Sequence, residues 1–392
     1  MLGLAGKVQR RIAHVWERRR QRVELSGLYA PDADDLDATR HLHEAMEWLK
    51  RAQDAGNDRG VAYGVDFGKG FDLSYPETTG YVCQTFVDQY RLTGDASLLK
   101  RAIEMADWEI SIQMANGAVM GGKYNTNPTP AVFNTGMVLL GWASLITETG
   151  EERFKLAARR ASDWLVKVQE KDGRWFEGNS DFALRDSTLY NVKAAWGLCE
   201  AGVALQEQRY IDAAVLNAEY CMSRQRSNGW LPECCLSDPS APLLHTLAYS
   251  MQGLVNIGKL AKRHDLIASA QRLADAELRI MGEDGFIPGR QREDFSAAVK
   301  WCCLTGSAQT SIVWSELFLL FGDEKYRSAV RTLNGYLLAH HDIQNSNPTL
   351  RGGLPGSWPV WGEYGRLQIL NWATKFLVDA LTLEAQINRT AK

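Results

Sequence analysis

Two kinds of apolar pattern alternate along the chain. Residues 98–113 place apolar side chains near helical spacing among charged ones, and an Asn-Gly pair, typical of a helix end, follows. Residues 135–146 carry no charged side chain and are apolar on nearly every side, as expected of a buried helix. The pattern predicts an amphipathic outer helix followed by an apolar inner helix.

This pair of helices recurs with a fixed period. Four Asn/Asp-Gly turns have glycines in equal steps of 56: Gly117, Gly173, Gly229 and Gly285. Weaker copies at 53–60 and 344–353 bring the number of repeats to six. A second landmark keeps the same step, apart from a slightly longer last interval: Leu98, Phe154, Tyr210, Leu266 and Tyr326.

Six such pairs predict an all-α fold, a closed (α/α)6 toroid. An open solenoid fits less well, because its usual repeats are about 34–47 residues long. We expect one toroid domain over 31–392, preceded by a basic extension over 1–30. The inner helices are expected to begin near these residues: Gly80, Gly136, Val192, Ala248, Gly306 and Ala373.

All inner helices of such a toroid run in the same direction. Their N-termini, and the long loops before them, therefore meet at one mouth, which is the expected binding site. The chain holds 13 tryptophans, and six lie at or beside these loops: Trp175, Trp230, Trp301, Trp358, Trp361 and Trp372. The formal charge of -3 gives no reason to expect a nucleic-acid partner.

The seven cysteines include two adjacent pairs, unlike the spaced set of a disulfide framework. We expect buried free thiols in a cytoplasmic protein, with no metal and no cofactor, because adjacent cysteines do not easily share one zinc ion. No apolar run reaches the roughly 18–20 residues of a membrane span. The basic N-terminus is expected to allow at most a weak peripheral contact with the inner membrane.

The mouth loops combine flat aromatic rings with amide, hydroxyl and carboxylate groups. A sugar ring has apolar faces and a polar rim, so this combination favours an oligosaccharide or polysaccharide ligand, which we expect to be acidic. The candidate binding residues are Tyr124, Asn134, Trp301, Gln309, Trp358, Trp361, Tyr364, Asn371 and Lys375.

Two sets of side chains are candidates for catalysis. Glu77 stands in the first turn of an inner helix and, with Asp186, could form the carboxylate pair of a glycoside hydrolase. Alternatively Tyr75, Tyr190 or His245 removes the proton next to a uronate carboxyl group, which an amide of Asn134, Gln309 or Asn371 neutralises. That chemistry is β-elimination or epimerisation, and the sequence leaves the two sets open.

Three strings resemble the VpsJ-like exopolysaccharide biosynthesis proteins: Ser74-Tyr-Pro-Glu-Thr-Thr-Gly80, Cys303-Leu-Thr-Gly-Ser-Ala-Gln309 and Asn371-Trp-Ala-Thr-Lys-Phe376. The likeness runs from about residue 37 to residue 383. It implies an (α/α)6 fold and a place in polysaccharide metabolism. It also strengthens four site candidates, namely Glu77, Gln309, Asn371 and Lys375.

The leading hypothesis is an enzyme that cleaves a glycosidic bond of an acidic, uronate-containing saccharide by hydrolysis or β-elimination. The second is a uronate C5-epimerase or amino-sugar epimerase on the same scaffold. The third is a saccharide-binding or assembly protein of a polysaccharide synthase complex, without catalysis.

Overall fold

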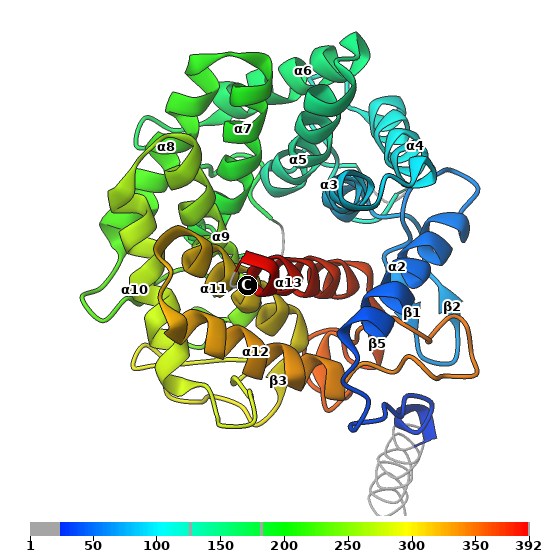
Figure 1. Ribbon diagram of the computed structural model, residues 1–392. Helices are drawn as coiled ribbons and strands as arrows, with labels where there is room; N and C mark the ends of the chain where they lie inside the picture. Colours follow the sequence, from blue (N-terminus) through cyan, green and yellow to red (C-terminus); the bar gives the residue numbers. More distant parts are fainter. Residues whose placement is uncertain (1–23, 125–127, 181–182, 391–392) are drawn as a thin grey trace, which may run out of the picture.

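The computed structural model describes residues 24–124, 128–180 and 183–390, in which twelve α-helices form two concentric rings (Figure 1). The inner ring consists of α3 (Pro76–Thr93), α5 (Val132–Thr149), α7 (Val192–Leu205), α9 (Leu244–Leu260), α11 (Leu304–Phe321) and α13 (Asn371–Thr390). The outer ring consists of α2 (Ala38–Asp54), α4 (Ala96–Ile112), α6 (Glu152–Val168), α8 (Gln208–Arg224), α10 (His264–Ile280) and α12 (Glu324–Ala339). The last inner helix, α13, packs against α2 and α3 and closes the ring. The predicted (α/α)6 toroid is confirmed.

Short antiparallel strands in the mouth loops add a small β component that the helical pattern did not predict. The strands β1 (Gly64–Asp66), β2 (Gly70–Phe71) and β5 (Gln368–Leu370) form one sheet in the order β2-β1-β5. A second pair joins β3 (Cys302–Cys303) to β4 (Ser357–Trp358), and the 3-10 turn η1 (Leu189–Asn191) leads into α7. The first sheet ties the first mouth loop to the last.

The repeated turn has a structural reason. In the third copy, the Gln169 side-chain amide donates to the carbonyl of Gly173 at 3.0 Å and to that of Ala213 in the next outer helix at 2.9 Å. Gly173 has a φ of 92°, in the left-handed region that favours glycine. Gln113 and Gln225 make the same two bonds in their own repeats. The repeat period therefore marks a bridge between consecutive outer helices.

Neighbouring inner helices approach closely enough for backbone contact. A Cβ atom on Gly197 of α7 would lie 1.8 Å from the carbonyl oxygen of Gly136 in α5. At the preceding junction, a Cβ on Gly80 of α3 would lie 2.4 Å from Cα of Val138. Glycine at these positions lets the inner ring contract around its axis.

The predicted helix starts lie within four residues of the observed ones, because several inner helices begin one turn earlier than the apolar pattern suggests. Most of the predicted basic extension, residues 1–23, lies outside the described residues. Tyr29 is buried, and its hydroxyl donates to the carbonyl of Gly353 at 2.9 Å. Among the described residues, no helix combines the length and apolarity that a membrane span needs.

We expect Gly197→Ala to lower the free energy of unfolding by about 2 kcal/mol or more, because the added methyl group forces the α5 and α7 backbones apart. Denaturant unfolding measures the change. Gly335→Ala in α12 is the matched control, since its Cβ would meet nothing within 4 Å. That variant should be unchanged or more stable by up to about 1 kcal/mol, and equal losses in both variants would contradict the role assigned to the Gly136–Gly197 contact.

Candidate active site

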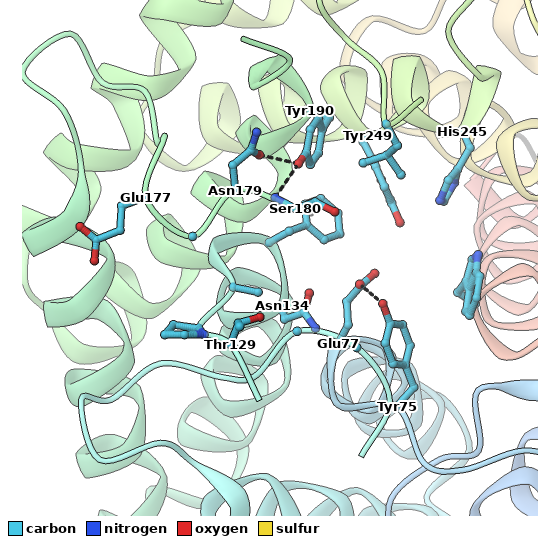
Figure 2. A pocket seen from close by; sticks show the side chains of 18 of the residues that line it. Tyr75, Glu77, Thr129, Asn134, Glu177, Asn179, Ser180, Tyr190, His245 and Tyr249 are labelled. Carbon is cyan, nitrogen blue, oxygen red and sulfur yellow. Dashed lines mark hydrogen bonds between the residues drawn. The ribbon is translucent and has the colours of Figure 1, made fainter. Parts of the chain in front are cut away.

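A cavity of about 760 Å³ opens at the mouth of the toroid (Figure 2). Its walls come from the N-terminal turns of α3, α5, α9 and α13, from η1 and from the loops before α3, α5, α7, α9 and α13, with Trp164 of α6 behind them. No lysine or arginine lines it in the part of the chain that the structure describes. Two glutamates do, Glu77 and Glu177.

Glu77 is the second residue of α3, after Pro76 at the first helical position. Its side chain points into the cavity, where the Tyr75 hydroxyl donates to Oε2 at 2.8 Å (Figure 2). Burial raises the pKa of Glu77 to about 7, although the hydrogen bond from Tyr75 and the charge of Lys193 act in the opposite direction. A carboxyl group with this pKa exchanges protons readily near neutral pH. Glu177 is exposed at the rim and points away from Glu77.

His245, in the first turn of α9, also faces the cavity. Its Nδ1 lies 2.6 Å from Oε1 of Gln309, and within the described residues Nε2 has no hydrogen-bond partner. Burial lowers the pKa of His245 to about 3, with a smaller contribution from the charge of Lys193. The imidazole is therefore neutral at neutral pH.

Aromatic rings form most of the remaining wall. Tyr63 contacts Trp372 edge-on, with ring centroids 4.8 Å apart, and Phe133 lies 4.7 Å from Tyr249. Burial raises the pKa of Tyr63 to about 12 and also raises the pKa values of Tyr75 and Tyr249. These tyrosines keep their protons at neutral pH and can donate hydrogen bonds to a ligand.

The structure brings six of the predicted site residues to this cavity: Tyr75, Glu77, Asn134, Tyr190, His245 and Tyr364. Tyr190 donates to Oδ1 of Asn179 at 2.5 Å, and burial raises its pKa. Raised tyrosine pKa values favour hydrogen bonding over the predicted role of Tyr75 or Tyr190 as a base.

Asp186 does not join Glu77. Asp186 is exposed and lies outside the cavity lining. The Ser187 amide donates to the Leu184 carbonyl, and the turn that this bond closes leaves Asp186 facing solvent. Thr188, two residues later, is buried instead. The carboxylate pair predicted for a hydrolase is therefore not assembled in this structure.

The predicted carboxylate-binding amides have protein partners. Asn371 donates to the carbonyl of Ala62 at 2.8 Å and to the Thr78 hydroxyl at 2.7 Å, so it fixes the first mouth loop. Asn134 lines the cavity but donates to the carbonyl of Met120 at 2.8 Å.

The amide nitrogen of Gln309 lies 3.0 Å from Oε1 of Gln252. The predicted ligand-binding Lys375 is buried, and its Nζ lies 2.5 Å from Asp379. Both side chains belong to the interior of the ring, not to the cavity wall.

The predicted tryptophans divide into three groups. Trp301 and the exposed Trp361 line a second hollow of about 410 Å³, together with Lys300 and Arg366. Glu363 borders this hollow, and the adjacent Tyr364 lines the main cavity. The remaining predicted aromatic residues are mostly structural.

Trp358 packs on His340, with centroids 4.7 Å apart, and Tyr124 on Trp108, at 5.6 Å. Trp175 and Trp230 are buried and pack in the core, although Trp230 also borders a hollow formed by the loops before α9 and α11. Trp372 does line the main cavity.

Several lining residues were not among the predicted ones, notably Tyr63, Asn179, Ser180 and Tyr249. Tyr249 follows His245 by one helical turn, and this spacing could have identified it. Tyr63 gave no such signal, because the β1–β5 pairing brings its loop to the cavity.

The seven cysteines are free and buried. Within the described residues, no group of three or more His, Cys, Asp or Glu side chains is arranged to hold a metal ion.

Glu77→Gln should make the difference in unfolding free energy between variant and wild type depend on pH. The folded-state pKa of Glu77 is raised from 4.5 to about 7, so the stability contributed by its bound proton is lost as the pH rises through this window. Between pH 4.5 and pH 8, the free energy of unfolding of the variant should rise relative to that of wild type by up to roughly 3 kcal/mol, at about 1.4 kcal/mol per pKa unit. Denaturant unfolding at both pH values measures this, and a constant difference would contradict the raised pKa.

Comparisons with known proteins support the fold. The chain has no match among protein-family models or curated proteins, so its likeness to VpsJ-like proteins stays an expectation. It resembles an unsaturated glucuronyl hydrolase specific for heparin, with a TM-score of 0.73, 16% identity, and coverage of 90% of this chain and 98% of that chain.

Two other solved structures have a TM-score of 0.70. Cellobiose 2-epimerase from Bacillus thermoamylovorans B4167 has 10% identity and coverage of 88% of this chain and 98% of that chain. A D-mannose isomerase has 14% identity and coverage of 92% and 100%. At these identities the comparisons establish a shared (α/α)6 fold.

Proposed function

We propose that the cavity is the active site of a saccharide epimerase or isomerase, in which Glu77 and His245 transfer protons. One observation carries this proposal. A carboxyl group with a pKa of about 7 and a neutral imidazole with an unoccupied Nε2 face the same aromatic-lined cavity (Figure 2). One supplies a proton, and the other accepts one.

The chemistry follows from the protonation states. Nε2 of His245 removes the proton from the carbon next to the carbonyl of an open-chain sugar, and protonated Glu77 donates to the carbonyl oxygen. The electron pair of the broken C–H bond forms the double bond of an enediol. The imidazolium of His245 then returns a proton to carbon. Delivery to the same carbon, after the enediol turns its opposite face towards Nε2, gives an epimer, and delivery to the neighbouring carbon gives an isomer. Return of the hydroxyl proton restores Glu77.

The lining favours a neutral sugar unit at the reacting position. Its rings offer flat surfaces, and its tyrosine hydroxyls offer hydrogen-bond donors. No cationic side chain lines the described cavity to balance a carboxylate beside Glu77. The names of two structural neighbours, a cellobiose 2-epimerase and a D-mannose isomerase, are consistent with this chemistry.

Deuterium exchange tests the proposal. Wild-type protein in D₂O, incubated with neutral sugars that include mannose and cellobiose, should replace one sugar C–H with C–D and form an epimer or isomer of unchanged chain length, followed by NMR. Glu77→Gln should lower the rate at least about 100-fold, as expected for loss of an acid–base group. The rate should fall as the pH rises through about 7, because Glu77 must be protonated.

Glu177→Gln is the matched control, because it makes the same substitution on an exposed side chain at the rim. Its rate should stay close to that of wild type. Equal rates in wild type and Glu77→Gln, or no exchange with any sugar of the set, would contradict the proposal.

A second candidate is cleavage of an unsaturated uronide, which keeps the acidic saccharide predicted from the sequence. The hollow beside the cavity favours it, because Lys300 and Arg366 can attract a carboxylate while Trp301 and Trp361 offer rings to the sugar faces. A substrate that already has a double bond needs one proton donor. Glu77 protonates one alkene carbon, water adds to the carbon that bears the ring oxygen and returns a proton to Glu77, and the resulting hemiketal opens. The anomeric carbon, now a hemiacetal, becomes an aldehyde as its glycosidic C–O bond breaks, and its hydroxyl proton passes to the leaving oxygen of the second sugar. A glucuronyl hydrolase among the structural neighbours is consistent with this route.

For this candidate, we expect an unsaturated uronyl disaccharide to lose the ultraviolet absorbance of its double bond on incubation with the protein. Lys300→Met/Arg366→Met should raise KM about tenfold and leave kcat near the wild-type value, because one lost charge-assisted contact costs about 1.5 kcal/mol or more. The control is Lys100→Met/Lys171→Met, which removes two exposed charges outside the hollow. Stable absorbance would eliminate uronide cleavage.

A further inference from the structure

A line of four buried side chains from three inner helices leads to the cavity. Lys193 of α7, Gln252 of α9 and Gln309 of α11 precede His245 in this line, and each is at most 2% exposed. Nζ of Lys193 lies 2.5 Å from Oε1 of Gln252, and Nε2 of Gln309 lies 3.0 Å from the same oxygen. The line ends at the 2.6 Å contact between Oε1 of Gln309 and Nδ1 of His245.

The amide orientations in the structure give each link a direction. The amino group of Lys193 donates to the oxygen of Gln252, which faces it. That oxygen also accepts from Gln309, which turns the amide nitrogen of Gln309 towards Gln252 and its oxygen towards His245. Nδ1 of His245 must then carry a hydrogen, and Nε2 keeps its lone pair.

Packing alone does not account for a lysine at this position. Nζ of Lys193 lies about 5 Å from the ring centroids of Trp196, Tyr249 and Phe376, and no carboxylate forms an ion pair with it in the described residues. Burying an amino group in such surroundings is costly, and an apolar side chain would avoid that cost. The hydrogen bond to Gln252 is the contact that an apolar side chain could not replace.

We propose that Lys193 is a positioning residue that, through Gln252 and Gln309, holds His245 in the tautomer with hydrogen on Nδ1 and a free Nε2. His245 is the base in the proposed function, so the catalytic role of Lys193 rests on that function. The tautomer itself is independent of any substrate. Lys193 acts at a distance, because Gln252 and Gln309 separate it from the imidazole.

The tautomer is measured directly by ¹H–¹⁵N NMR of the histidine side chains of the full chain, with His245 assigned by the signals lost in His245→Gln. Wild type should show a protonated Nδ1 and an unprotonated Nε2. In Lys193→Met, Gln252 loses the donor that fixes its orientation, both glutamines are free to turn over, and the second tautomer should appear. On any sugar that wild type converts, kcat should fall in proportion to the lost tautomer, with KM unchanged.

Lys375→Met is the matched control, because Lys375 is a second buried lysine of the inner ring that contacts Asp379 instead of this line. It should leave the His245 tautomer unchanged. Gln252→Glu should also preserve the tautomer, since a carboxylate can only accept from Lys193 and Gln309, whereas Gln252→Leu should release it. If Lys193→Met does not fold, the comparison of Gln252→Glu with Gln252→Leu still tests the proposal.

Three results would overturn the proposal: wild-type His245 with hydrogen on Nε2, an unchanged tautomer in both Lys193→Met and Gln252→Leu, or the same mixture of tautomers in Lys375→Met. Failure of the sugar assay together with the expected NMR pattern would instead remove the proposed epimerase and leave the positioning of His245 in place.

Discussion

Backbone contact between neighbouring inner helices is the constraint on which the site depends. Gly141, Gly197 and Gly253 each face the preceding inner helix, and a Cβ atom at any of them would lie 2.5 Å or less from a backbone oxygen of that helix. Consecutive glycines of this set are one repeat of 56 residues apart. The repeat therefore determines the contact between inner helices as well as the fold. The ring is therefore narrow, and the first turns of its helices converge on one cavity.

The narrow ring also explains the protonation states. Side chains that point inward lose water, which disfavours their charged forms. This desolvation raises the pKa of Glu77, lowers that of His245 and lowers that of Lys193. On the surface at neutral pH, Glu77 would be charged and His245 partly charged. In the cavity, burial favours a protonated Glu77 and a neutral His245. Close packing of the inner helices thus accounts for both the cavity and the shifted pKa values.

The sequence predicted what the repeat determines and not what individual loops determine. The period gave the toroid, the direction of its helices and the mouth, and hence the placement of Glu77 and His245 at one cavity. Loop conformations decide the rest: one turn exposes Asp186, and a short β-sheet brings Tyr63 inward. Gln309 was predicted to meet the ligand, but a buried amide bonds to the nearest polar groups, which here are His245 and Gln252.

The same period relates the two proposed acid–base residues. Glu77 and His245 are separated by three full repeats, so they occupy equivalent positions in the first and fourth inner helices. In a closed ring of six pairs, helices three steps apart lie opposite each other, and equivalent side chains in their first turns face the same axis. The two copies between them carry Phe133 and Leu189 at this position, so neither intervening copy places a charge there. The two proposed proton-transfer groups therefore stand half a ring apart, with Phe133 and Leu189 in the intervening repeats. In the proposed function this arrangement lets one group act on a sugar carbon while the other acts on its oxygen.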